Sequence, residues 1–184
     1  MEIKLLPAQY DYLTLKSKYK LFIGGIGSGK TTAGSVDAIY NVANYPGIPG
    51  GIFANSYRQL TNATLTSFQA QLNKYKIPFS YNQQKGVMNV SGTKIFCLSM
   101  DNFDIHRGIE IGWGWIDEVQ DTEEEAFQVI AGRLRYPGGP LNLGMTGSAK
   151  GFNWVYRRFA GKDKNEEFKY VKSKTTDNKH LDAG

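Results

Sequence analysis

A glycine-rich stretch from Gly24 to Thr31, Gly-Gly-Ile-Gly-Ser-Gly-Lys-Thr, constrains this chain more than any other feature. It has the spacing G-x-x-x-x-G-K-T, follows the apolar run Leu21-Phe22-Ile23, and precedes an amphipathic run that ends near Asn44. A buried strand, a tight loop and a helix in that order are the context in which this spacing binds phosphate. Glycines let the backbone approach a ligand closely, so that successive N–H groups cradle phosphate oxygens at the helix N-terminus. The stretch therefore predicts a nucleotide-binding loop.

The loop residues have separate expected roles. Lys30 is expected to reach the β- and γ-phosphates, and the Thr31 hydroxyl to ligate Mg²⁺. Upstream of the loop, Gln9 follows Pro7 by two residues, and its amide donor and acceptor match the N6 and N7 edge of adenine. A plain N-terminal surface helix fits the same residues equally well. The full predicted nucleotide-binding set is Gln9, Gly25, Gly27, Ser28, Gly29, Lys30, Thr31 and Thr32.

A second apolar run, from Glu110 to Ile116, ends in the two acids Asp117 and Glu118. An acid at the end of such a strand can hold the Mg²⁺ shell, which we expect of Asp117. We expect Glu118 to orient and deprotonate an attacking water. Neighbouring side chains on an extended chain point to opposite sides, so the two acids can divide metal and water between them. With the phosphate loop, this pair predicts nucleotide hydrolysis.

The order of apolar runs predicts an α/β fold. Strand and helix patterns alternate through residues 21–76, which requires a parallel sheet with helices on its faces. Residues 79–98 form short alternating runs separated by turn residues, which predicts an antiparallel β-ribbon whose last strand re-enters the sheet. Thr122-Glu123-Glu124-Glu125 predicts a capping box at a helix start. A further strand over residues 141–145 leads to Thr146 at the carboxyl edge, where ligands gather, so Thr146 could sense the γ-phosphate.

Composition adds limits. The chain of 184 residues carries a net charge of +5, compatible with a polyanionic partner, and its basic residues are spread over Lys16–Lys20, Lys74–Lys76, Arg157 and Arg158. No apolar run approaches the ~18 residues that span a membrane. Cys97 is the only cysteine, which excludes an internal disulfide and fits a reducing cytoplasm. Residues 1–175 are expected to form one domain and residues 176–184 a linker stub.

The ordered set of motifs resembles the ATPase domain of the large terminase subunit of tailed bacteriophages, a P-loop ATPase of the RecA-like (ASCE) type. The resemblance rests on Leu6-Pro7-Ala8-Gln9, residues 24–32, Tyr57-Arg58-Gln59-Leu60, Arg107-Gly108-Ile109-Glu110 leading to Trp115-Ile116-Asp117-Glu118, Thr146-Gly147-Ser148, Asn153-Trp154 and Thr175-Thr176-Asp177-Asn178. It implies a three-layer fold with a mainly parallel central sheet, and ATP and Mg²⁺ as ligands. It also implies Gln9 as the adenine reader, Glu118 as the catalytic carboxylate, Thr146 as the coupling residue and Arg107 as an arginine finger.

The same resemblance implies partners and a location. These are double-stranded DNA moved into a procapsid, a homo-oligomeric ring on the portal, the small terminase subunit, and the cytoplasm of the infected host cell, with no membrane. Many relatives carry an arginine inside the phosphate loop where this chain has Ile26, which leaves the finger open between Arg107, Arg133 and Arg135. No nuclease activity is expected of these residues, because the clustered acids of the family's C-terminal nuclease domain are absent from them.

Other interpretations remain open. A nucleotide-gated DNA-binding module without efficient hydrolysis would carry the same loop. Another kind of P-loop NTPase is also an alternative, although a GTPase would need an Asn-Lys-x-Asp motif and a helicase would need a second motor domain.

Overall fold

One sheet organises the computed structural model, which describes residues 3–103 and 108–178. Within these residues the strand order is β3-β4-β5-β2-β6-β7-β1-β8. The strands are β1 (Tyr19–Gly24), β2 (Gly50–Ala54), β3 (Phe79–Asn82), β4 (Val87–Val90), β5 (Thr93–Ser99), β6 (Trp113–Asp117), β7 (Asn142–Gly147) and β8 (Phe168–Ser173). From β5 to β8 all neighbours run parallel, while β3, β4 and β5 pair antiparallel. The predicted parallel sheet is confirmed, and so is a β-ribbon whose last strand re-enters it.

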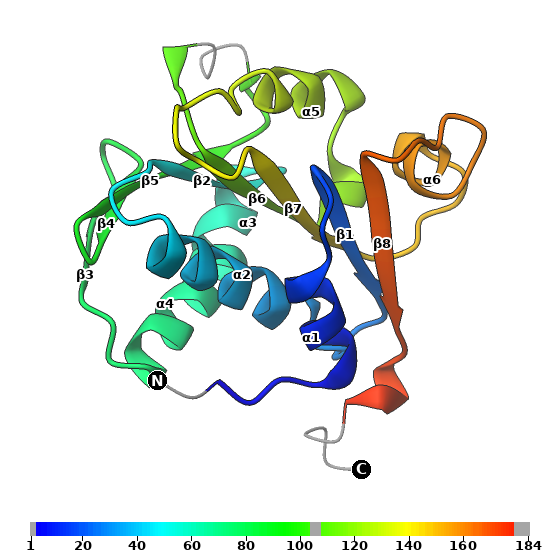
Figure 1. Cartoon of the computed structure of the whole chain (residues 1–184), viewed down its shortest axis with the longest axis horizontal. Coiled ribbons are helices and arrows are strands. Elements are labelled where there is room, and N and C mark those ends of the chain that lie inside the picture. The colour runs from blue at the N-terminus through cyan, green and yellow to red at the C-terminus, as the bar shows by residue number, and fades with distance from the viewer. Residues whose placement is uncertain (1–2, 104–107, 179–184) are drawn as a thin grey trace.

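Helices cover both faces of this sheet (Figure 1). One face carries α1 (Pro7–Thr14), α2 (Lys30–Asn44) and α4 (Leu65–Lys74), and the other carries α5 (Glu124–Ala131) and α6 (Trp154–Phe159). Alternation along β1 divides the core accordingly: Leu21 packs into the cluster that contains α5 and α6, whereas Phe22 packs with Tyr12 and Ala33 from α1 and α2. The predicted three-layer arrangement is confirmed.

The strand order brings three polar strand ends together. β7 lies between β1 and β6, with Ile23 paired to Gly147 and Ile116 paired to Met145. The carboxyl ends of all three strands therefore meet at one edge of the sheet, where the phosphate loop begins. Ligands of open α/β sheets bind at this edge.

Two buried contacts fix α2 on the sheet behind the loop. Lys20 Nζ in β1 lies 2.5 Å from Asp37 Oδ1 in α2, and both side chains are almost fully buried. Gly34 lies against the indole of Trp115, where an added Cβ would come within 2.2 Å of the ring. Lys20 is therefore part of the core and not of the basic surface that the sequence predicts.

Several predicted boundaries shift. The last helix pattern within residues 21–76 begins with the short α3 (Tyr57–Gln59) and a π-helical turn (Leu60–Thr64) before α4. The strand predicted from Glu110 begins only at Trp113. The capping box at Thr122 is wrong. Thr122 instead closes the 3₁₀ turn Val119–Asp121, and α5 begins after Glu123, which makes no side-chain capping bond. No described helix is long and apolar enough to cross a membrane.

Candidate active site

The phosphate loop connects β1 to α2 through two left-handed glycines. Gly27 has φ 75° and Gly29 has φ 82°, a region that side chains with a Cβ rarely adopt. α2 then begins at Lys30, with Gly29 as its N-cap. Ser28 is fully buried and Lys30 nearly so, which shows that this part of the loop packs against the body of the domain at the N-terminus of α2. This is the local structure that the glycine spacing predicts.

The loop lysine contacts the acid that directly follows β6. Lys30 Nζ lies 3.3 Å from Glu118 Oε1, so the strand ends of β1 and β6 converge on one ion pair. Glu118 itself has φ 52° and ψ 47°, a left-handed conformation that is uncommon outside glycine. The two acids therefore diverge because the chain turns at Glu118, not because it stays extended as the sequence predicts. Backbone strain of this kind is frequent at functional sites.

Asp117, the last residue of β6, directly precedes Glu118 and is 1% exposed. Its Oδ1 accepts a hydrogen bond of 2.7 Å from the Thr146 hydroxyl, and its Oδ2 accepts one of 2.9 Å from the Thr64 hydroxyl. Burial raises the pKa of the Asp117 carboxyl above its ordinary value, and the two hydroxyl donors oppose that shift. Thr146 also accepts from the indole Nε1 of Trp115 at 2.8 Å. A buried polar chain thus runs from Trp115 through Thr146 to Asp117.

Gln120 is a site residue that the sequence analysis missed. Its Nε2 donates to Glu118 Oε2 at 2.6 Å, while its Oε1 accepts from the backbone N–H of Ser148 at 2.9 Å. One amide therefore ties the Glu118 carboxylate to the segment that follows β7. Gly147 has no room for a side chain here, because an added Cβ would lie 2.5 Å from Gln120 Oε1. The only sign of this role in the sequence is that Gln120 follows Glu118 by two residues.

Gln9 touches the loop from α1. Its Nε2 donates to the carbonyl of Gly29 at 3.0 Å, and its Oε1 accepts from the N–H of Leu6 at 2.9 Å. An amide has two donors and two acceptor lone pairs, so one of each remains for another partner. The surface-helix alternative is therefore incomplete, because Gln9 is buried in a helix that contacts the phosphate loop.

A cavity of about 700 Å³ lies between α1 and the chain after β8. It adjoins the loop, since Leu6 is close to Gly29. Its walls are mostly apolar on the α1 side and polar on the other; they are formed by Leu5, Leu6, Pro7, Ala8, Asp11, Ser173, Thr176 and Asp177.

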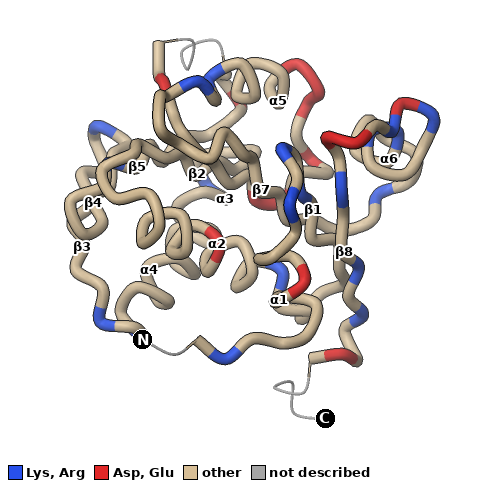
Figure 2. The backbone as a smooth tube through the Cα atoms, viewed as in Figure 1, with Lys and Arg blue, Asp and Glu red and all other residues tan. Residues whose placement is uncertain are grey.

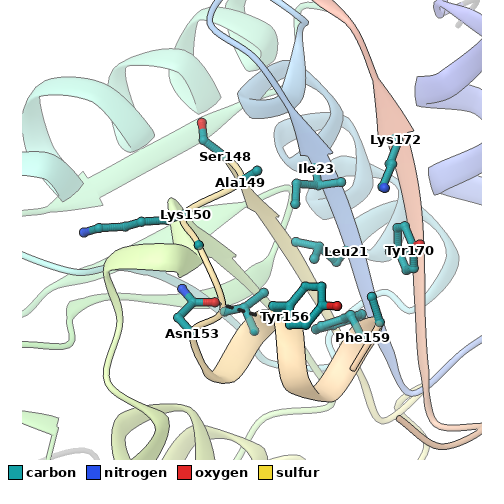
Figure 3. A pocket seen from close by; sticks show the side chains of 13 residues that line it. Leu21, Ile23, Ser148, Ala149, Lys150, Asn153, Tyr156, Phe159, Tyr170 and Lys172 are labelled. Carbon is teal, nitrogen blue, oxygen red and sulfur yellow. Dashed lines mark hydrogen bonds between the residues drawn. The ribbon is translucent and has the colours of Figure 1, made fainter. Parts of the chain in front are cut away.

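A smaller pocket of about 140 Å³ lies on the opposite face of the sheet, between β1 and α6. Figure 3 shows Leu21 and Ile23 of β1 facing Tyr156 and Phe159 of α6. Its lining is almost entirely apolar, and Ser148 at its rim is the residue whose N–H is bound by Gln120. Such a lining does not suit phosphates, so the loop side is the candidate nucleotide site.

The arginine-finger candidates are only partly placed. Arg107 lies outside the described residues. Arg135 forms an ion pair of 2.9 Å with Glu110, and Arg133 lies in the turn after α5. Ile26 in the phosphate loop is 88% exposed, so this position faces outward.

Basic residues do not form one free surface. Figure 2 shows Lys and Arg distributed over most of the chain. Arg157 and Arg158 both contact the Glu124 carboxylate, at 2.7 and 2.8 Å, and Lys18 pairs with Glu167 at 3.3 Å. Much of the basic surface predicted for DNA is therefore engaged in ion pairs.

Within the described residues there is no group of three or more His, Cys, Asp or Glu side chains that could hold a metal ion. The residues predicted to ligate a cation at the loop are Thr31 and Asp117.

Comparisons with known proteins place this geometry in a family. A family model described as phage terminase large subunit matches residues 16–184. The large terminase of a thermophilic bacteriophage superposes with a TM-score of 0.87 at 15% identity, over 98% of this chain and 48% of that one. The complex of that terminase with ADP superposes with a TM-score of 0.82 at 15% identity, over 95% and 46% of the two chains. The ATPase domain of the Thermus phage P74-26 large terminase gives a TM-score of 0.67 at 17% identity, over 92% of this chain and 80% of that one.

The chain spans about half the length of the first of these proteins. No curated protein sequence matches it.

Proposed function

The chain belongs to the phage terminase large subunit family, and on that premise we propose that its phosphate loop and Glu118 hydrolyse ATP to drive double-stranded DNA into a viral procapsid. The observation that carries the proposal is the contact of 3.3 Å between Lys30 Nζ and Glu118 Oε1. It joins the residue suited to bind phosphate to the residue suited to activate water. Relatives of the same fold have been solved with ADP and with ATP-γ-S.

In the proposed reaction, the triphosphate of the bound ATP replaces Glu118 as the partner of the Lys30 ammonium. The freed Oε1 of Glu118 then accepts a proton from the attacking water, while Gln120 holds Oε2 and so keeps the carboxylate in place. The water oxygen bonds to the γ-phosphorus as the bond to the β,γ-bridging oxygen breaks, which gives ADP and phosphate. The lysine ammonium and the loop N–H groups stabilise the charge that spreads over the phosphoryl oxygens.

Thr31 and Asp117 are the proposed Mg²⁺ residues, and the ion would neutralise phosphate charge when bound. Both Asp117 oxygens already accept threonine hydroxyls, which favours contact with the ion through water. Thr146 links Asp117 to β7, and Gln120 links Glu118 to Ser148. Loss of the γ-phosphate would therefore change contacts at Thr146 in β7 and at Ser148 directly after it, which supports Thr146 as the coupling residue.

The base and ribose are proposed to lie in the cavity of about 700 Å³ that is lined by Leu6, Pro7 and Ala8, the segment directly before Gln9. Its apolar wall of Leu6, Pro7 and Ala8 suits a purine face, and Gln9 keeps one donor and one acceptor for the adenine edge. Thr176 and Asp177 on the opposite wall are polar partners for ribose hydroxyls. The other predicted loop contacts, Gly25, Gly27, Ser28, Gly29 and Thr32, remain proposals.

The proposed partners follow from the family. They are double-stranded DNA, neighbouring copies in a ring on the procapsid portal, and the small terminase subunit, in the cytoplasm of the infected cell. A ring would let Arg107 complete the site of a neighbour, because Ile26 brings no charge to the loop. The boundary at residue 175 and the linker role of residues 176–184 remain predictions.

Binding and hydrolysis test the proposal together. Wild type should hydrolyse ATP in the presence of Mg²⁺, and Lys30→Ala should bind ADP more weakly and lose turnover by about 100-fold or more. Equal turnover in the two proteins would refute the assignment. For the ring, wild type is mixed with Arg107→Ala; a rate per subunit that is independent of mixing and of concentration would exclude a finger supplied in trans.

A further inference from the structure

The turn that follows β8 is hydrogen-bonded to the outside of the phosphate loop. Thr175 Oγ1 donates to the carbonyl of Ile26 at 2.9 Å, and Asn178 Nδ2 donates to the carbonyl of Gly27 at 2.6 Å. Thr175 lies 149 positions from Ile26 in the chain, and Asn178 lies 151 positions from Gly27. The sequence analysis uses Thr175 to Asn178 only as one motif of the family resemblance, at the boundary between the domain and the linker stub, and gives these residues no role.

The turn is held in place by its own structure and by β8. The N–H of Lys174 donates to Asp177 Oδ2 at 2.7 Å, and the N–H of Asp177 donates back to the carbonyl of Lys174 at 3.0 Å. β8 pairs with β1 up to Gly24 and Ser173, directly before the loop and the turn. The two segments therefore leave the same pair of strands side by side, which positions the donors without a long flexible connection.

The fit leaves no space for a side chain on the loop. A Cβ added to Gly25 would lie 2.6 Å from Thr175 Oγ1. The hydroxyl thus occupies the place that an ordinary residue at position 25 would fill. Close approach of the turn, and not only of phosphate, constrains this glycine.

The hydrogen bonds from Thr175 and Asn178 also affect the backbone N–H groups of the loop that are available to phosphate. A glycine-rich loop loses much conformational entropy when it is ordered. The carbonyl of Ile26 shares its peptide unit with the N–H of Gly27, so a donor on the outside polarises an N–H available to phosphate on the inside. With Gln9 on the carbonyl of Gly29, side chains from both ends of the chain hold the loop.

We propose that Thr175 and Asn178 are positioning residues of the nucleotide site, which hold the phosphate loop in its binding conformation. Because coupling free energies are reciprocal, bound nucleotide must in turn stabilise the turn on the loop. The C-terminal turn is thereby a sensor of nucleotide occupancy. This inference depends on the proposed function for one point, namely that ADP or ATP binds at the phosphate loop.

The test compares Thr175→Val, Asn178→Leu and the double variant with wild type. Calorimetric titration with ADP should show affinity about three- to tenfold weaker for each single variant and weaker still for the double variant. Inorganic tripolyphosphate should lose affinity by a similar factor, because the effect acts through the loop and not through the base. Thr175→Ser, which keeps the hydroxyl, is the matched control and should stay within about twofold of wild type.

Hydrogen exchange gives a second test, in which the comparison of the double variant with wild type needs no ligand. In the double variant, amides of residues 24–30 should exchange faster than in wild type, and in wild type ADP should slow exchange at residues 175–178. A folded double variant with unchanged ADP affinity and unchanged exchange at residues 24–30 would overturn the proposal. Absence of ADP binding by wild type would contradict the proposed function instead, while the exchange of the free protein would still decide whether the turn holds the loop.

Discussion

Replacement of Thr146 by valine tests the buried polar chain beneath the catalytic pair. Thr146 is fully buried; its hydroxyl donates to Asp117 Oδ1 at 2.7 Å and accepts from Trp115 Nε1 at 2.8 Å. Valine has nearly the same shape, so packing is retained while both bonds are lost. A buried donor left without a partner costs about 1–3 kcal/mol, and a bond to a charged group contributes about 1.5–3 kcal/mol. We therefore expect Thr146→Val to lower the free energy of unfolding by about 2.5–6 kcal/mol.

Urea denaturation followed by tryptophan fluorescence and circular dichroism measures this loss. Thr146→Ser is the matched control, because it keeps the hydroxyl and removes only a methyl group, at a cost of about 1 kcal/mol. The reasoning is refuted if Thr146→Val is no less stable than Thr146→Ser. An ATPase assay on the folded fraction then reports whether the same hydroxyl matters for turnover, as the proposed coupling role requires.

Three further outcomes are expected. Gln120→Ala should lower kcat about tenfold or more with little change in KM, because it releases Glu118 Oε2 without touching the phosphate loop, and Gln120→Glu should not rescue it; steady-state kinetics decide. Gly34→Ala should destabilise the fold by about 1–3 kcal/mol in thermal or urea unfolding, since the new methyl group would meet the Trp115 indole; an increase in stability would mean that the helix-propensity gain prevails. Burial raises the pKa of Cys97 to about 12, and the thiolate is the reactive form, so a thiol reagent at pH 8 should label the native protein far more slowly than the urea-unfolded protein.

The sequence was sufficient for the parts of the fold that repeat a local pattern. The strand and helix around Gly24–Thr31, the apolar strand that ends at Asp117, and the ribbon at residues 79–98 all follow from periodicity and turn residues. The parallel arrangement also follows, because alternating strands and helices allow little else. The capping box failed because Thr122 closes a 3₁₀ turn, and its carbonyl accepts the indole Nε1 of Trp154 at 2.6 Å, a contact between distant segments.

The side-chain partners within the site could not be predicted in the same way. The place of β7 between β1 and β6 puts Thr146 against Asp117, and the left-handed turn at Glu118 returns Gln120 to the carboxylate two residues before it. Both depend on tertiary placement, which periodicity does not encode. The Thr175 and Asn178 contacts with the loop are more extreme, since 149 and 151 positions separate the partners. Their residues stood out only as part of a family resemblance, without a role.

Turnover by Glu118→Gln is the most direct test of the claim that the phosphate loop and the two acids at the end of β6, Asp117 and Glu118, form one hydrolytic site. The substitution keeps the size of the side chain and removes its ability to accept a proton from water. We predict that Mg²⁺-dependent ATP hydrolysis falls by about 100-fold or more, while ADP binds at least as tightly as to wild type, since Lys30 no longer faces a carboxylate. Unchanged hydrolysis would contradict the account. Binding of ATP by wild type without measurable hydrolysis would also contradict it, and would favour a nucleotide-gated DNA-binding module.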